Sequence, residues 1–150
     1  GVMSFDEMDA MMYKIEGEDL YLIGTSEHSM EHAMSAYHQA LPHGAGLIMI
    51  SVAYYQHFVD CHVCDERFIT MAKALGKADV SCAQDFVDAL VQLQKDCGVY
   101  DLKMSGFGIL EEELDTLAKN ARETMGGLFG ADPCALSHEE CVAIFQKSYR

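Results

Sequence analysis

The stretch "LIMISVAYYQHFVD", residues Leu47–Asp60, decides the fold class. Apolar side chains fall on nearly every face of a helix drawn through it, which is typical of a helix buried in the middle of a bundle. The apolar run around it, Ala45–Tyr55, is about half the ~20 residues that a membrane-spanning helix needs. The sequence therefore predicts a central buried helix and no membrane segment.

Segments with apolar residues at helical spacing lie on both sides of this helix. Upstream, a stripe of apolar residues followed by Gly17 predicts a first helix. The stripe consists of Phe5, Met8, Met12 and Ile15. The other predicted helices cover residues 25–38, 65–75, 81–97, 111–125 and 138–149, with loops at 101–108 and 126–133. No β alternation is found, so the expected fold is all-α: one domain over residues 1–150 with six to seven helices.

Composition narrows the classes of function. The chain carries 24 acidic and 10 basic side chains, a formal net charge of −14. Such a charge disfavours nucleic acid and anionic membrane surfaces as partners, because both attract cationic faces. With no signal peptide at the acidic "DEMD" start, the expected location is the cytoplasm.

Six cysteines could pair as disulfides, but a domain of 150 residues can build a core without them, so reduced thiols are expected. Cys61 and Cys64 form a C-x-x-C. A zinc ribbon needs a second such pair, and a redox motif needs a βα context. The pair is therefore interpreted as part of a helix end.

The stretch "SEHSMEHAMSAYHQALPHGAG", residues 26–46, holds four of the seven histidines. His28 and His32 are four residues apart and share one helix face. His43 follows Pro42, where a turn can bring its ring back toward that face. The spacing alone leaves two interpretations open, a solvated polar face or a metal site. The other histidines look ordinary, with no pattern that indicates a function: His38, His57, His62 and His138.

A second metal hypothesis rests on "HSMEH", which fits the H-x-x-E-H signature of a class of zinc peptidases. His28 and His32 would then bind zinc, and Glu31 would activate the attacking water. This hypothesis needs a distant third ligand, for which Glu111, Glu112 or Glu113 could be offered. It is the least favoured alternative.

The longer segment "EHSMEHAMSAYHQALPHGAGLIMISVAYY" resembles the metal-binding segment of the iron-containing alcohol dehydrogenases. That family has a histidine, a second histidine four residues later, and then Pro-His-Gly, matched here by His28, His32 and Pro42–Gly44. The end of the chain, "ILEEELDTLAKNARETMGGLFGADPCALSHEECVAIFQKSY", is similar to the family's C-terminal helices. The resemblance covers about residues 25–150, and residues 1–24 diverge.

The resemblance implies roles for individual residues. His28 and His43 match ligands of the active-site metal, Fe²⁺ or Zn²⁺, and His32 matches a residue of the cleft between cofactor and substrate, a candidate in proton transfer. The bound metal would act as a Lewis acid on the alcohol oxygen while hydride passes to a nicotinamide.

Parts of the family's pattern are not found. Its other two ligands come from an upstream D-x-x-x-H, but here Asp9 is followed by Tyr13, Asp6 by Ala10, and no histidine precedes His28. The glycine-rich turn of its nucleotide-binding domain also has no counterpart.

The expected function is therefore the C-terminal metal-binding domain of an NAD(P)-dependent oxidoreductase, a truncated domain that is inactive alone. NAD(P) would bind only with the missing N-terminal domain. The alternative is a non-catalytic binding or oligomerisation module derived from the family, which associates with itself.

Overall fold

The computed structural model describes residues 25–150, which form six α-helices and three short 3-10 helices and contain no strand. The all-α prediction is therefore confirmed for this part of the chain, and the helix predicted around Met8 lies outside it. The α-helices are α2 (Thr25–Tyr37), α3 (His43–Asp60), α4 (Asp65–Ala74), α5 (Gln84–Asp96), α6 (Leu114–Thr124) and α7 (His138–Ser148). The 3-10 helices are η1 (Met104–Phe107), η2 (Glu111–Glu113) and η3 (Gly126–Ala131).

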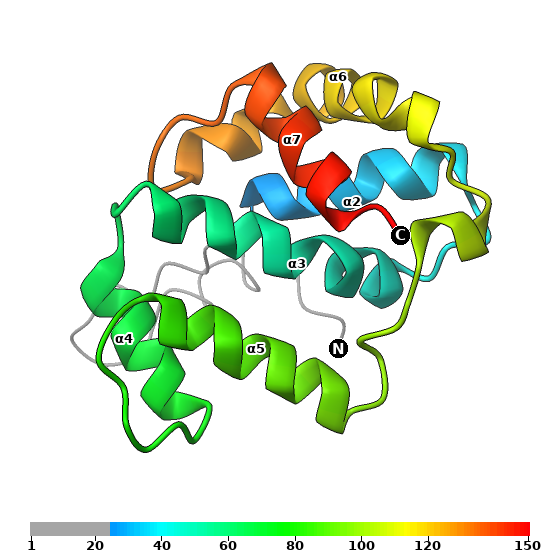
Figure 1. Cartoon of the computed structure of the whole chain (residues 1–150). Helices are drawn as coiled ribbons and strands as arrows, with labels where there is room; N and C mark the ends of the chain where they lie inside the picture. The colour runs from blue at the N-terminus through cyan, green and yellow to red at the C-terminus, as the bar shows by residue number, and fades with distance from the viewer. Residues whose placement is uncertain (1–24) are drawn as a thin grey trace, which may run out of the picture.

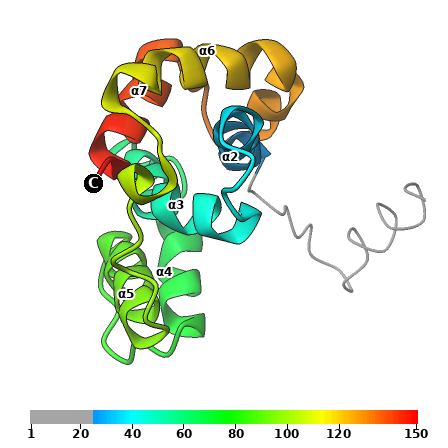
Figure 2. The ribbon, with the colours of Figure 1, turned by 90° about the vertical axis from the view of Figure 1, so that its right-hand side faces the viewer.

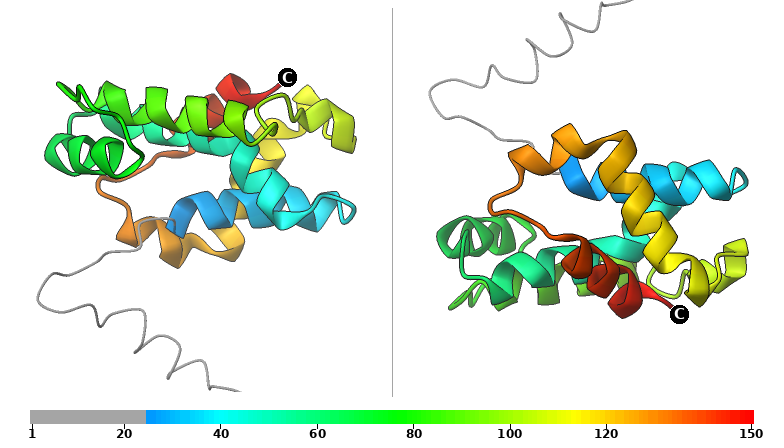
Figure 3. Two further views of the ribbon diagram at one scale, coloured as in Figure 1. Left: turned by 90° about the horizontal axis from the view of Figure 1, so that it is seen from below. Right: turned by 90° about the horizontal axis from the view of Figure 1, so that it is seen from above.

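Helix α3 lies in the middle of the arrangement, as its apolar sequence predicts (Figure 1). It packs against α2, α5 and α7. Helices α2, α6 and α7 lie on one side of α3, and the α4–α5 pair lies on the other (Figure 2). Seen from above or below, α2 and α6 cover one side of the molecule together with η3 (Figure 3).

The core is built on the rings of α3. Tyr54 and Phe58 are at most 1% exposed, and their ring centroids lie 5.0 Å apart in an edge-to-face arrangement. Phe145 of α7 and Met34 of α2 are also fully buried. Burying side chains of this size contributes roughly 1.5–3 kcal/mol each, so α3 holds the other helices together.

Short-range signals in the sequence predicted several helix ends correctly. Ser137 and Glu140 have the spacing of a capping box and form one at the start of α7: the Glu140 amide donates to the Ser137 hydroxyl and the Ser137 amide to the Glu140 carboxylate. Gly76 ends α4 with a φ of 87°, a conformation that favours glycine. Cys61 and Cys64 cap the end of α3 and the start of α4, which confirms their interpretation as part of a helix end.

Other predicted boundaries were wrong. Helix α3 begins at His43 and not at Leu47, because Pro42, with φ −65°, is the N-cap and directs the chain straight into the helix. Helix α5 begins at Gln84 and not at Ser81, because the Asp85 carboxylate accepts the amides of residues 81 and 82.

The two predicted loops contain η1 and η3, and the helix predicted at 111–125 begins as η2. These 3-10 helices of three to six residues are too short for the periodicity of the sequence to show. Among the helices of residues 25–150, none is long and apolar enough to cross a bilayer.

Candidate metal centre

Helix α2 presents its histidines on a narrow exposed stripe. His28, His32 and Ala36 are exposed at intervals of four residues. Most of the helix around them is buried: Ser26, Glu27, Ser29, Met30, Glu31, Ala33 and Met34. His28 and His32, the two predicted site histidines of α2, are therefore on the same accessible face, as their spacing indicated.

His43 joins this face from the first residue of α3. The turn at Pro42 brings its ring to 5.3 Å, centroid to centroid, from the ring of His28 and to 5.3 Å from that of His32. The structure thus brings all three predicted site histidines together at the junction of α2 and α3.

Glu31, which the sequence offered only as the water-activating residue of the peptidase hypothesis, lies behind the histidines and contacts His43. Its carboxylate is fully buried, with one oxygen in hydrogen-bond contact with Nδ1 of His43 and the other accepting the hydroxyl of Ser35. A carboxylate accepts, so Nδ1 of His43 donates, and Nε2 of that ring is left with the lone pair that a metal needs. Carboxylate partners of this kind commonly orient metal-binding histidines.

The approach of Glu31 to α3 depends on Gly46. A Cβ placed at Gly46 would lie 2.6 Å from Cγ of Glu31, closer than packed atoms allow. The other glycine of this turn, Gly44, has open space around the same position. Of these two glycines, only Gly46 is required by a close approach.

The donor set fits a divalent metal ion. One ligand atom each from Glu31, His32 and His43 lie within 4.8 Å of one another, and the ring of His28 borders the same group. Imidazole and carboxylate groups suit Fe²⁺ and Zn²⁺. The compact group thus includes His32, which the family resemblance places in the cleft and not among the ligands.

The peptidase hypothesis finds little support in this geometry. Glu31, which would activate water, is fully buried and held by His43 and Ser35. Of the acidic residues offered as a third ligand, Glu113 instead accepts the backbone amide of Leu110 and contacts Nε2 of His38 at 3.1 Å.

A buried polar network lies behind the histidine face. Tyr54 donates to the carboxylate of Asp132 at 2.9 Å, and its hydroxyl is also 2.9 Å from that of Ser26. Next to this network, burial raises the pKa of Glu27 from 4.5 to about 7, although a hydrogen bond from Tyr55 opposes the rise. Glu27 therefore changes charge near neutral pH inside the protein.

Comparison with solved structures places this fold among the alcohol dehydrogenases. The chain is 31% identical to an archaeal halo-thermophilic alcohol dehydrogenase from a Red Sea brine pool, with a TM-score of 0.73, over 81% of this chain and 32% of that one. A mutant of the same enzyme matches at 30% identity and a TM-score of 0.73. A 1,3-propanediol oxidoreductase shares the fold with a TM-score of 0.72 and 19% identity, over 83% of this chain and 32% of that one.

Comparison of the sequence with protein families and with known proteins gives no further indication of fold or activity. No protein-family model matches the chain. A serine–tRNA ligase of Thermococcus sibiricus is 63% identical over 30 residues, which is 20% of this chain and 7% of that protein. A match over so short a segment carries no inference about fold or activity.

The helical fold of this chain is similar to about a third of each of these dehydrogenase structures. The resemblance to the iron-containing alcohol dehydrogenase family is thereby confirmed for the helical part of the chain. The chain spans about a third of the length of these structural relatives, 32% of each.

Proposed function

We propose that this chain is the metal-binding helical domain of an iron-containing, NAD(P)-dependent alcohol dehydrogenase. The observation that carries the proposal is the meeting of three histidine rings, those of His28, His32 and His43, at one face of a fold shared with alcohol dehydrogenases. In this proposal His28 and His43 are ligands of Fe²⁺ or Zn²⁺, and His32 lines the cleft and serves in proton transfer.

The residues of this chain would perform distinct tasks. Glu31 holds the ring of His43 through Nδ1, which fixes the tautomer and directs Nε2 outward. His32, exposed one turn from His28, would exchange a proton with bound substrate or water. The metal, when bound, supplies Lewis-acid polarisation of the alcohol oxygen.

A nucleotide-binding partner domain is part of this proposal. The described residues contain no strand, and Gly126–Gly127 begin a 3-10 helix directly after α6, so this part of the chain offers no strand-to-helix turn for a pyrophosphate. The second candidate function, a non-catalytic module that associates with itself, needs no such partner. Oligomeric state measured together with metal content separates the two.

Metal affinity is expected to depend on His28 and His43. Replacing either by alanine should weaken Zn²⁺ or Fe²⁺ binding by more than the ~10–100-fold that loss of an outer-shell partner costs. Isothermal titration calorimetry of the chain and both variants measures this. His62→Asn is the matched control, because that exposed histidine contacts Asp65 and adopts a positive φ that asparagine tolerates.

Two results would count against this ligand assignment. If neither His28→Ala nor His43→Ala changes the isotherm, the roles implied by the family are wrong. If His32→Ala abolishes binding while His28→Ala has no effect, the compact group of His32 and His43 with Glu31 is the ligand set.

The chain alone is expected not to oxidise alcohols or reduce aldehydes with NAD(H) or NADP(H). Hydride transfer needs the nicotinamide held against the reacting carbon, and such orientation supplies ~7–11 kcal/mol of a barrier. The check is the absorbance of the reduced cofactor with short alcohols and aldehydes, metal present and protein at high concentration. Turnover that disappears in His43→Ala would overturn the expectation.

A further inference from the structure

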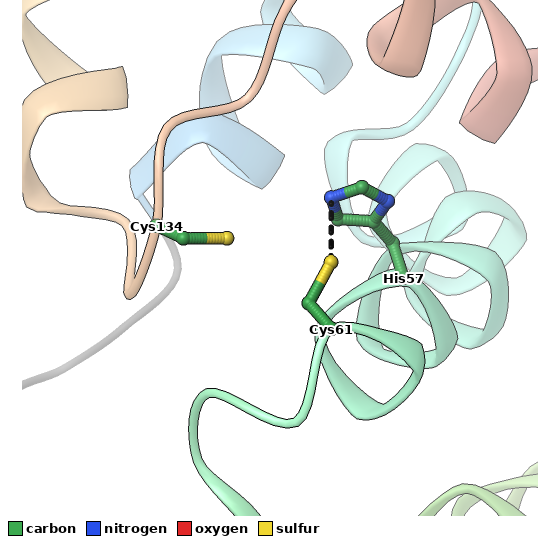
Figure 4. Close-up of side chains that lie close together, drawn as sticks. All are labelled: His57, Cys61 and Cys134. Atoms are coloured by element: carbon green, nitrogen blue, oxygen red, sulfur yellow. Dashed lines mark hydrogen bonds between the residues drawn. The ribbon is translucent and has the colours of Figure 1, made fainter.

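A second cluster of metal-binding side chains lies at the far end of α3 from the histidine face. Nε2 of His57 is 3.7 Å from Sγ of Cys61, and Sγ of Cys134 completes a group whose ligand atoms all lie within 4.8 Å of one another. Figure 4 shows the two sulfur atoms and the imidazole turned toward a common space. His57 looks ordinary in the sequence, and Cys61 and Cys134 lie far apart in the chain.

Two separate parts of the fold build this cluster. His57 and Cys61 are four residues apart at the end of α3, so they lie one above the other on a single face. Cys134 comes from the connection between η3 and α7. The α7 capping box supplies a neighbouring oxygen: Oε2 of Glu140 accepts the amide of Ser137, while Oε1 lies 3.9 Å from Nε2 of His57.

The surroundings of Cys134 disfavour the charged form of its thiol. Burial raises the pKa of the Cys134 thiol above its usual range, and Cys61, Glu140 and Asp132 raise it further. The negative groups around Cys134 thus oppose its ionisation. A divalent cation would reverse this, because a coordinating thiol loses its proton outright.

We propose that His57, Cys61 and Cys134 bind a thiophilic divalent cation of the Zn²⁺ class, which links the end of α3 to the segment before α7. Two thiolates and an imidazole are preferred zinc ligands, and the Glu140 carboxylate, 3.9 Å from Nε2 of His57, offers a fourth donor. Both thiol protons leave on binding, so affinity falls as the pH is lowered. This site is independent of the histidine face and of the proposed dehydrogenase function.

Thiol protection in the unmodified chain tests the proposal without any substitution. The reduced protein is treated with iodoacetamide without Zn²⁺ and with enough Zn²⁺ to fill both this site and the histidine face, and each cysteine is followed by mass spectrometry. Alkylation of Cys61 and Cys134 is expected to slow at least about tenfold, while the exposed Cys82 and Cys97 react at unchanged rates. Equal rates with and without Zn²⁺ at Cys61 and Cys134 would overturn the proposal.

Cobalt(II) distinguishes this site from the histidine face, which contains no sulfur ligand. Binding at the cysteine site gives a thiolate-to-cobalt charge-transfer band, expected to persist in His43→Ala and in the control Cys97→Ser. It is expected to disappear in Cys61→Ser and in Cys134→Ser, whose folding is checked by circular dichroism. A band that remains in both serine variants would overturn the proposal. A second contradicting result is a Cys61–Cys134 disulfide in the untreated protein together with no metal binding after that disulfide is reduced.

Discussion

Replacing Glu27 by glutamine is expected to make the protein about 3 kcal/mol more stable than the wild type at about pH 8.5, and to change its stability little at about pH 5. The reason is that burial raises the pKa of this carboxyl from 4.5 to about 7 in the folded protein. A raised carboxyl pKa contributes stability that is fully present below about 4.5 and is lost as the pH rises through about 7. Glutamine keeps the shape of the protonated acid and removes the buried charge.

Urea unfolding at both pH values, with chelator present, measures this difference. Glu112→Gln is the matched control, because it removes one carboxylate from an exposed position. The account of Glu27 fails if Glu27→Gln and Glu112→Gln change the free energy of unfolding equally at about pH 8.5.

Gly46→Ala is expected to lower stability by about 1–3 kcal/mol and to weaken metal binding by ~10–100-fold. The new methyl group would meet Cγ of Glu31 at 2.6 Å, in the middle of that buried side chain, and would push the carboxylate away from His43. His43 would then lose the partner that orients its ring.

Gly44→Ala is the matched control for this substitution. It lies in the same turn of α3 with nothing within 4 Å of the added atom. Alanine in a helix is favoured over glycine by roughly 0.5–1 kcal/mol, so this variant should be more stable and bind metal normally. Thermal unfolding and calorimetric titration of both variants provide the comparison, and equal behaviour of the two would contradict the role given to Gly46.

The fold could be predicted largely because its decisive signals are local. The apolar run of α3, the capping box of Ser137 and Glu140, and the stop at Gly76 each depend on residues within one or two helical turns. The predicted start of α3 lies too late because proline and glycine commonly interrupt helices. In the structure Pro42 is the N-cap, and Gly46 is needed for packing against Glu31.

The histidine face could be predicted only in part. The spacing of His28 and His32 determines a shared face on any helix, and the turn after Pro42 suggested that His43 could join it. The family resemblance added only the ligand roles of His28 and His43. The contact between Glu31 and His43 depends on how closely α2 and α3 pack, which no local pattern encodes. The meeting of Cys61 with Cys134 is also a long-range consequence of the fold, since α4 to α6 lie between them in the chain.

The central claim, a metal site formed by His28 and His43, is tested most directly by NMR of the histidine ring nitrogens during a Zn²⁺ titration. The Cys134→Ser variant is used so that the cysteine cluster does not compete for the ion. The account predicts that a ring nitrogen of His28 and Nε2 of His43 shift to metal-bound positions, while His62 and His138 stay unchanged. Zn²⁺ binding that leaves the ring nitrogens of both His28 and His43 unshifted would contradict it.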